Sequence, residues 1–332
     1  MNYRPLGKTG LTVSEIGFGG WAIGGNAFGN SYGDTDDDVS RAALRAAIDA
    51  GVNLFDTADV YGHGHSEALI SEVLKDYLDS SPSRFGRGAE ERGGVGSEPV
   101  VVTKGGVNFY RKDDTLEQDW TPYGVAHALQ QSLYRLRRDT LDVWLLMNPP
   151  VREMQRFRVW ETLEALRRAD KVRFYGVSVA EPGDAEWLLQ TGAPVDVIEV
   201  AYSLFYQAPA VDLFDMADRA GVGLLVREPL ANGFLAEKDH SRIFDDGDIR
   251  GGLPPEYVHA MRDVSGRLSF LADNTGRTPA QAALRFALDE PKVASVIVGM
   301  KTPEQVAENV AAVDVAAIDE AERRRVSEAF HE

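Results

Sequence analysis

The sequence predicts an α/β fold, a closed (β/α)8 TIM barrel with an N-terminal β-hairpin cap. Eight short apolar runs alternate along the chain with longer segments of helical period. The runs are continuously apolar, which is typical of parallel strands buried on both faces. Eight such units in 332 residues favour a closed barrel over an open doubly wound sheet. The open sheet is the alternative, although the first run leads into GFGGWAIGG rather than a G-x-G-x-x-G turn.

The chain begins with the predicted hairpin, because residues 3–6 and 12–16 flank the turn KTG and would cap the barrel floor. The eight expected strands are residues 16–20, 52–57, 100–104, 141–147, 174–179, 195–201, 223–228 and 294–299. Amphipathic segments between them predict helices, for example at residues 39–50, 123–138 and 159–171. Gly51 and Gly221 follow two such segments, where glycine relieves the left-handed backbone at a helix end.

Residues 1–332 are expected to form a single barrel domain with two polar excursions. Residues 79–98 are rich in Gly, Ser, Arg and Glu without a hydrophobic period, which predicts a loose surface loop. Residues 237–255 follow the seventh strand. Loops after strand carboxyl ends lie on the active face of a barrel, so this excursion is the candidate substrate lid.

Composition excludes several classes of protein. Thirty-five Lys and Arg against 52 Asp and Glu give a formal net charge of −17, which repels nucleic acid and anionic membrane surfaces. The chain has no cysteine, so disulfides and thiolate chemistry are excluded. No apolar run reaches the roughly 18 residues that cross a bilayer, and no signal peptide is recognisable. We expect a cytoplasmic protein, with no metal site predicted and its oligomeric state left open.

Three polar residues follow strands that end at the same mouth of the predicted barrel. Asp56 ends the second strand, Tyr61 lies in the loop after it, and Lys104 ends the third. A tyrosine hydroxyl with a pKa of about 10 is a poor acid–base group at neutral pH. A nearby ammonium would lower that pKa, and the carboxylate would hold the lysine in place. An ordinary buried ion pair beside a loop aromatic is the alternative, and spacing alone does not separate the two.

Several strings, in order along nearly the whole chain, resemble the aldo-keto reductase family. They are YRPLGKTGLTVSEIGFGGWAIGG, NLFDTADVYGHGHSEALISEVL, VVVTKGG, FYGVSV, VREPLANGFL and SVIVGMKTPEQVAENV. The resemblance implies an NAD(P)H-dependent reductase that transfers hydride to a carbonyl. It implies that Tyr61 is the general acid, that Lys104 tunes its pKa and that Asp56 pairs with Lys104.

One catalytic position departs from the family pattern. The family carries a histidine at the end of the fourth strand, in a string such as DLYLLHNP, and this chain reads DVWLLMNP with Met147 there. A thioether cannot donate a hydrogen bond, and losing one donor to a developing oxyanion typically costs ~10²–10³ in rate. His63 and His65 follow Tyr61, but we interpret them as solvated loop residues rather than replacements.

The resemblance also implies a cofactor site. Ser178 keeps one nicotinamide contact, Val179 removes another, and Glu199 stands where the family has glutamine. Lys301 and Gln305 lie where the family meets the 2′-phosphate, and a lysine there favours NADPH over NADH. The expected cofactor-binding residues are Gly20, Trp21, Ser178, Glu199, Arg227, Pro229, Leu230, Gly233, Gly299, Lys301, Gln305, Glu308 and Asn309.

Three functions remain open at this point. The first is NADPH-dependent reduction of a small carbonyl or a conjugated enone. The second is a non-redox elimination or epimerisation on the same fold. The third is a nucleotide-binding subunit with vestigial catalysis, like the barrel-fold subunits of potassium channels in this superfamily. The retained Asp56, Tyr61 and Lys104 favour the first over the third.

Overall fold

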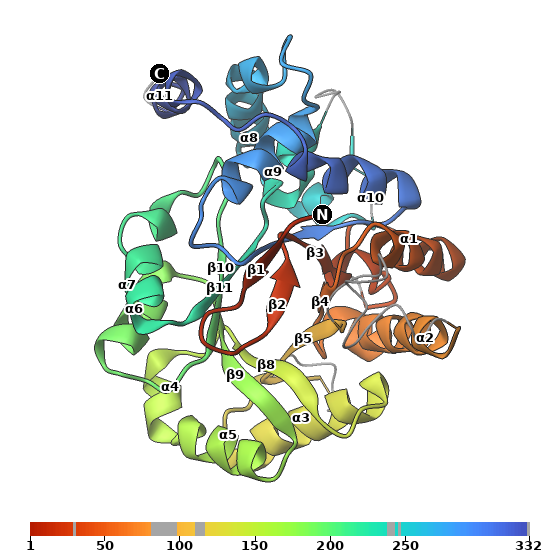
Figure 1. Ribbon diagram of the computed structural model, residues 1–332, viewed down its shortest axis with the longest axis vertical. Coiled ribbons are helices and arrows are strands. Elements are labelled where there is room, and N and C mark those ends of the chain that lie inside the picture. Colours follow the sequence, from red (N-terminus) through yellow and green to blue (C-terminus); the bar gives the residue numbers. More distant parts are fainter. Residues whose placement is uncertain (29–30, 81–97, 110–116, 238–242, 245–246, 331–332) are drawn as a thin grey trace.

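The computed structural model describes residues 1–28, 31–80, 98–109, 117–237, 243–244 and 247–330. Among these residues, eight parallel strands close into a barrel in the order β10-β11-β12-β3-β4-β5-β8-β9, which confirms the predicted (β/α)8 fold (Figure 1). The strands are β3 (Ile16–Gly19), β4 (Leu54–Asp56), β5 (Val100–Gly105), β8 (Leu141–Met147), β9 (Val172–Val179), β10 (Val197–Ala201), β11 (Gly223–Arg227) and β12 (Ser295–Gly299).

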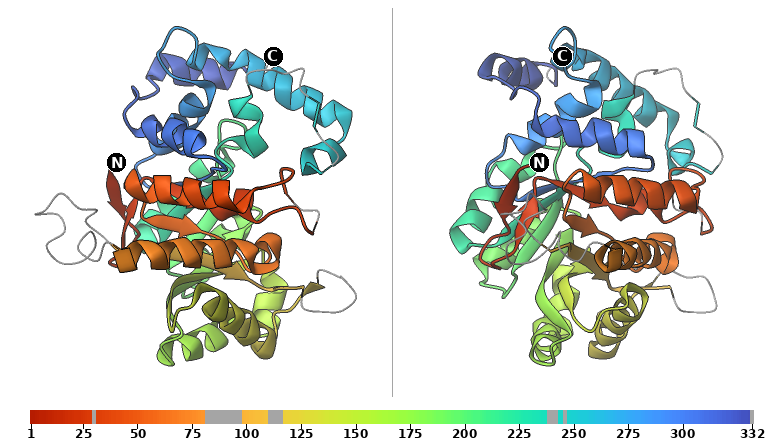
Figure 2. Two further views of the ribbon diagram at one scale, coloured as in Figure 1. Left: turned by 90° about the vertical axis from the view of Figure 1, so that its right-hand side faces the viewer. Right: turned by 45° about the vertical axis from the view of Figure 1, so that its right-hand side comes forward.

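Helices surround the barrel, and α1 and α2 run side by side along its outside (Figure 2). The helices are α1 (Asp37–Asp49), α2 (His65–Ser80), α3 (Pro122–Leu136), α4 (Val151–Arg156), α5 (Val159–Arg168), α6 (Pro182–Gln190), α7 (Leu213–Ala220), α8 (Pro255–Arg267), α9 (Pro279–Leu288), α10 (Pro303–Val310) and α11 (Glu320–Glu328). Gly51 and Gly221 follow α1 and α7 with φ of 91° and 71°, as expected of helix-ending glycines.

The predicted N-terminal hairpin is present and covers one end of the barrel (Figure 1). Strand β1 (Tyr3–Pro5) pairs antiparallel with β2 (Thr12–Ser14). Leu6, Leu11 and Val13 pack with the residues that fill the barrel interior. A second small hairpin, β6 (Val107–Asn108) with β7 (Glu117–Gln118), follows β5.

Side-chain alternation along the strands separates two cores. Val143 and Leu145 of β8 pack inside the barrel, whereas Trp144 and Leu146 pack outside it against the helices. Because successive side chains point to opposite faces, the last inward position of each strand opens at the carboxyl-end mouth. Those positions are Gly19, Asp56, Lys104, Met147, Ser178, Ala201, Arg227 and Gly299, and Glu199 is the inward position before Ala201.

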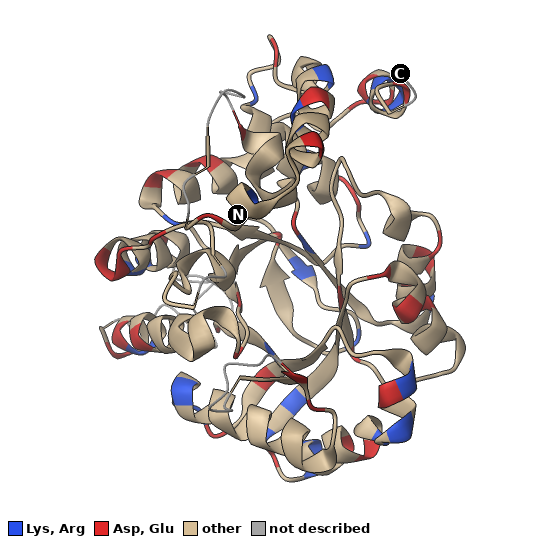
Figure 3. Ribbon diagram, turned by 180° about the vertical axis from the view of Figure 1, so that it is seen from behind, with Lys and Arg blue, Asp and Glu red and all other residues tan. Residues whose placement is uncertain are grey.

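The two predicted excursions fall partly outside the described residues. Residues 79 and 80 complete α2, and residues 81–97 lie outside the described part of the chain. The excursion at 237–255 contains a described 3₁₀ turn, Ile249–Gly252, and ends at the start of α8. No described helix combines the length and apolarity needed to span a membrane. Acidic and basic residues gather mainly on the outer helices (Figure 3).

Candidate active site

A cluster of three buried charged residues lies at the carboxyl-end mouth. The Lys104 ammonium donates to Asp56 Oδ2 at 2.5 Å and to the Thr57 carbonyl at 3.0 Å. Its Nζ also lies 3.2 Å from Glu199 Oε2. Asp56 and Lys104 take the last inward positions of β4 and β5, and Glu199 takes the inward position before the last of β10, so the barrel brings together residues 56, 104 and 199. The sequence predicted the Asp56–Lys104 pair but not that Glu199 joins it.

Burial decides the protonation states within this cluster. Burial first, and then the charge of Glu199, raise the pKa of Asp56 well above its usual value. Burial opposes ionisation of Glu199, yet Lys104, Asp56, Arg227 and Ser178 together outweigh it and the pKa of Glu199 is lowered. Asp56 and Glu199 in turn outweigh the effect of burial on Lys104 and raise the pKa of its ammonium. The cluster therefore holds an ionised Lys104 and Glu199 beside an Asp56 that retains a proton readily.

Tyr61 begins the 3₁₀ turn Tyr61–Gly64 after β4, and its ring centroid lies 5.4 Å from Lys104 Nζ. The backbone N–H of Asp59 donates to the Lys104 carbonyl at 3.0 Å, which fixes this loop on β5. Burial raises the pKa of Tyr61 to about 12, and the opposing effect of Lys104 is offset by Asp56 and Glu199. The expectation of a lowered tyrosine pKa is therefore wrong, because burial, Asp56 and Glu199 outweigh Lys104 and Arg227.

Met147 is the last residue of β8 and pairs in register with Ser178. Its side chain takes an inward position by alternation and is partly buried. The next residue, Asn148, has a φ of 49°, and its N–H donates to the Ser178 carbonyl at 2.7 Å. The backbone thus turns away directly after Met147, at the rim of the mouth.

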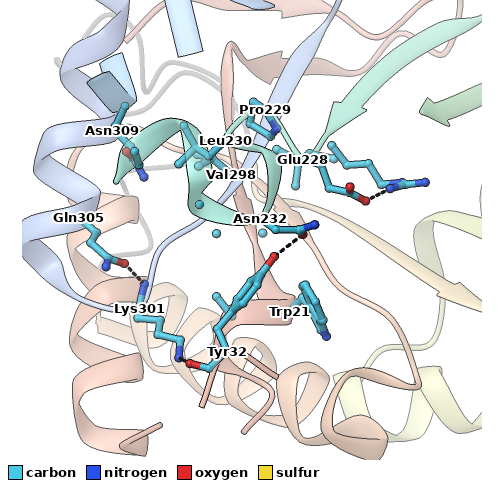
Figure 4. Close-up of a pocket in the computed structure, with 18 of the residues that line it drawn as sticks. Trp21, Tyr32, Glu228, Pro229, Leu230, Asn232, Val298, Lys301, Gln305 and Asn309 are labelled. Carbon is cyan, nitrogen blue, oxygen red and sulfur yellow. Dashed lines mark hydrogen bonds and ion pairs between the residues drawn. The ribbon is translucent and has the colours of Figure 1, made fainter. Parts of the chain in front are cut away.

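An elongated cavity of about 660 Å³ opens beside this cluster (Figure 4). Asp56, Tyr61 and most of the predicted cofactor residues line it, namely Trp21, Glu199, Arg227, Pro229, Leu230, Gly233, Gly299, Lys301, Gln305, Glu308 and Asn309. Gly20, Lys104, Met147 and Ser178 are not part of its wall. Gly20 instead packs against α2 and the end of β4, since a Cβ there would lie 2.5 Å from Ser66 Oγ and 2.8 Å from the Asp56 carbonyl. Ser178 reaches the wall indirectly, by donating to Glu199 Oε1 at 2.9 Å.

Sequence reasoning missed a set of contacts that bridges three loops across the cavity, which we call the clasp (Tyr32, Asn232, Lys301 and Arg250). The Tyr32 hydroxyl donates to Asn232 Oδ1 at 2.6 Å, and Lys301 Nζ donates to the Tyr32 carbonyl at 2.7 Å (Figure 4). Arg250 donates to the Asn232 carbonyl at 3.1 Å, and its guanidinium lies 5.0 Å from the Tyr32 ring centroid.

Part of the excursion that the sequence suggests as a lid contacts other loops through the clasp. Arg250 lies in the described part of the 237–255 excursion, next to Asp248, which binds it at 2.6 Å. Asp248 forms an antiparallel bridge with Tyr32, so this part of the excursion is paired with the loop that leads into α1. The only sequence signal was the Asp248–Arg250 spacing within a polar stretch, which does not reveal its partner. The Lys301 ammonium donates here to the Tyr32 backbone carbonyl. The sequence had placed this ammonium where the family meets the 2′-phosphate.

The two loop histidines are more constrained than predicted. The His63 ring is stacked between Phe28 and Phe109, with centroids 3.7 Å and 4.6 Å away. His65 Nε2 lies 2.8 Å from Asp37 Oδ1. Both side chains stay partly exposed, as expected of solvated loop residues, although aromatic neighbours distant in sequence stack on one and an acidic residue of α1 binds the other.

At the mouth of the closed barrel, Tyr61 and the Lys104–Asp56 pair thus lie beside the cavity. The model of the aldo/keto reductase family matches residues 15–330. The chain belongs to this family. It is an NAD(P)H-dependent oxidoreductase of the aldo-keto reductase type, which confirms the predicted enzyme class.

Three similar proteins show the range of the relatives. The NADH-specific methylglyoxal reductase of Escherichia coli is 28% identical, with 95% of this chain and 94% of that protein aligned. A probable voltage-gated potassium channel subunit beta of Arabidopsis thaliana is also 28% identical, over 95% of this chain and 92% of its own length. The solved glycerol dehydrogenase AKR11B4 of Gluconobacter oxydans is 25% identical, with a TM-score of 0.75, covering 96% of this chain and 92% of that one.

The cavity fits a nicotinamide dinucleotide. It runs from Tyr61 and Glu199 at one end to the start of α10 at the other, where Gln305 and Asn309 line it. Glu199 Oε2 is buried without a hydrogen-bond partner among the described residues, although it lies at the wall. A buried acceptor of this kind matches an amide donor such as a carboxamide.

Proposed function

We propose that the protein is an NADPH-dependent reductase that transfers a hydride to the carbonyl, or conjugated enone, of a small organic substrate. The observation that carries this proposal is the placement of Tyr61, beside Lys104 and at the wall of the long cavity. When bound, the nicotinamide supplies the hydride. Trp21, Arg227, Pro229, Leu230 and Gly233 would hold its nicotinamide half, and Gln305, Glu308 and Asn309 the adenosine end, as the cavity wall allows.

Tyr61 acts as the general acid in this proposal. Its pKa of about 12 keeps the hydroxyl protonated at neutral pH, so it can donate a proton to the oxygen that gains charge as hydride arrives. The Lys104 ammonium stabilises the phenolate that remains, and Asp56 holds Lys104 in place at 2.5 Å. At neutral pH the protonated form of Tyr61, which reduction requires, is therefore the populated one.

The choice of NADPH over NADH rests on Lys301 at the cavity wall. Its ammonium contacts the Tyr32 carbonyl and would turn to a 2′-phosphate when one is present. Binding constants for NADPH and NADH, measured with the protein and with Lys301→Met, test this. NADPH should bind more tightly to the parent protein, and the substitution should remove the difference. Equal affinities in the parent protein would overturn the NADPH assignment.

Consumption of NADPH with a panel of aldehydes, quinones and enones tests the reductase itself. Turnover of at least one class is expected, and a folded, nucleotide-binding protein that oxidises no NADPH with any of them would overturn the proposal.

Met147 favours one second candidate, an elimination or epimerisation, because the position that should orient a carbonyl holds a side chain without a donor. Product analysis with catalytic amounts of NADP⁺ would reveal turnover without net oxidation. The substrate being a small molecule, and a cytoplasmic location, remain predictions of the sequence.

A further inference from the structure

The catalytic cluster contains more negative than positive charge. Asp56, Lys104 and Glu199 are 3%, 1% and 0% exposed, and one ammonium lies between two carboxylates, at 2.5 Å and 3.2 Å. With all three groups ionised, one negative charge is left over. An uncompensated buried charge is strongly unfavourable, so the site must take up either a proton or a cation.

The nearest other cation is already committed. Arg227 Nε lies 3.9 Å from Glu199 Oε1, but the Arg227 guanidinium is paired with Glu228 and donates to the Val179 carbonyl at 3.0 Å. Arg227 and Glu228 therefore balance one another. Across these groups two cations, Lys104 and Arg227, face three carboxylates, so one negative charge is left over although Arg227 also lies within ion-pair distance of Glu199.

The surplus charge lies at the wall of the cavity. Asp56 and Glu199 both line it, together with Tyr61, and both share the single ammonium of Lys104. Without a cation in the cavity the cluster takes the proton, since burial and Glu199 raise the pKa of Asp56 well above its usual value. A positively charged ring in the cavity would supply the missing charge instead.

We propose that Asp56 and Glu199, paired around Lys104, make this end of the cavity selective for a cationic ring, so that oxidised nicotinamide binds more tightly than reduced nicotinamide. This inference rests on the proposed function, which requires the nicotinamide beside Tyr61. The ring of NADP⁺ carries a positive charge and that of NADPH does not. Reduction consumes a carbonyl compound, NADPH and a proton and yields an alcohol and NADP⁺, so the cluster stabilises the product form of the cofactor and slows its release.

A proton should leave when the cation enters. The titratable groups that face Glu199 are Asp56, Lys104, Tyr61 and Arg227 with its partner Glu228. Of these, Asp56 is the one with a carboxyl pKa raised by burial and Glu199. Binding of NADP⁺ should therefore release a proton and strengthen as pH rises toward the raised pKa of Asp56, whereas binding of NADPH should change little.

Isothermal titration calorimetry with NADP⁺ and NADPH, without any substrate, tests the inference. In the parent protein NADP⁺ should bind about tenfold more tightly than NADPH, the scale expected of one weakly screened charge close to the ring. Glu199→Gln keeps the shape and removes the charge, and should abolish that preference. Glu199→Asp keeps the negative charge, so this variant should still bind NADP⁺ more tightly than NADPH. Glu256→Gln is the matched control, because it removes the same charge from an exposed residue of α8 and should leave the preference unchanged.

Each outcome separates this inference from the proposed function. If neither form binds to the parent protein, the proposed function fails. If both bind with equal affinity, or if Glu199→Gln leaves their ratio unchanged, the function stands and the inference is overturned. Thermal melting shows whether Glu199→Gln is folded. If it is not, the affinity ratio of the parent protein and its dependence on pH decide, and a ratio near one at every pH contradicts the inference.

Discussion

Tyr61, Lys104 and Met147 show how much single residues decide at this mouth. Tyr61 and Lys104 follow different strands and meet within 5.4 Å, which gives the hydroxyl a cationic neighbour as its charge changes. Met147 takes the inward rim position of β8, in register with Ser178, and brings no hydrogen-bond donor. At this scale proton donation is retained, while the means of orienting a carbonyl differs from the family pattern.

Replacing Tyr61 with phenylalanine should lower the reduction rate by ~10²–10⁴, the usual contribution of a positioned general acid. Nucleotide affinity should stay nearly the same, because the change removes one oxygen and keeps the ring. Steady-state kinetics and nucleotide titration measure the two effects. Activity equal to that of the parent protein would remove Tyr61 from the mechanism.

The reduction rate should be independent of pH across neutrality with respect to Tyr61. Its pKa is raised to about 12 by burial, so the acid form is present below that value and is lost as pH rises through it. The dependence of kcat on pH, measured with a substrate that has no titrating groups, checks this. An alkaline fall in kcat that begins near pH 7 and vanishes in Tyr61→Phe would contradict the assignment.

Met147→His should raise reduction of simple aldehydes if the methionine only lacks a donor, by up to ~10². Met147→Leu is the matched control, since it changes the apolar side chain without adding a donor, and it should leave that rate low. kcat/KM for a series of aldehydes measures both. A histidine variant that gains nothing and loses an enone or other reaction of the parent protein would show that Met147 is shaped for a different substrate.

At the scale of elements, loops from three strand ends meet over the cavity in the clasp. Tyr32 follows β3, Asn232 follows β11 and Lys301 follows β12, and each is joined to another by a hydrogen bond of 2.6–2.7 Å. Trp21 supports the Tyr32 ring edge-on at 4.6 Å. All the clasp residues line the cavity, so we expect their contacts to hold a nucleotide bound there.

Tyr32→Phe should therefore speed the release of nucleotide by about fivefold, since one hydrogen bond contributes about 1 kcal/mol. The ring contact with Trp21 is kept, so the effect isolates the hydroxyl. Stopped-flow fluorescence gives the dissociation rate. Tyr134→Phe, at a ring 78% exposed on α3, is the control and should release nucleotide at the parent rate. Identical rates in both variants would mean that the clasp does not hold the ligand.

At the scale of the whole molecule, the barrel depends on a plug from its own N-terminus. Leu6 is fully buried with the interior residues of the barrel, and the N–H of Lys8 donates to the Gly221 carbonyl at 2.9 Å. Arg4 binds carbonyls of residues 288, 290 and 293 at 2.7–2.9 Å. The hairpin thus links the first residues to the last third of the chain, and we propose that residues 1–332 fold as one domain.

Leu6→Ala should lower the free energy of unfolding by ~2–5 kcal/mol, the range for truncating a fully buried leucine. Val211→Ala, at a side chain 73% exposed, should change it by no more than about 0.5 kcal/mol. Denaturant unfolding of both variants measures the difference. A Leu6→Ala protein as stable as the control would show that the hairpin is not part of the cooperative core.

The sequence by itself determined the barrel, its strand bounds to within a few residues, and the positions of Asp56, Tyr61 and Lys104 on one mouth. It could do so because strand burial, helix ends and strand carboxyl ends leave local patterns in the chain. Only the tertiary structure decided that Glu199 joins the Lys104 cluster, that the pKa of Tyr61 rises, that Tyr32 closes over the cavity and that His63 is stacked between two phenylalanines. Each of these depends on contacts between residues far apart in the sequence and on how completely water is excluded between them. No short stretch of the sequence determines either the contacts or the burial.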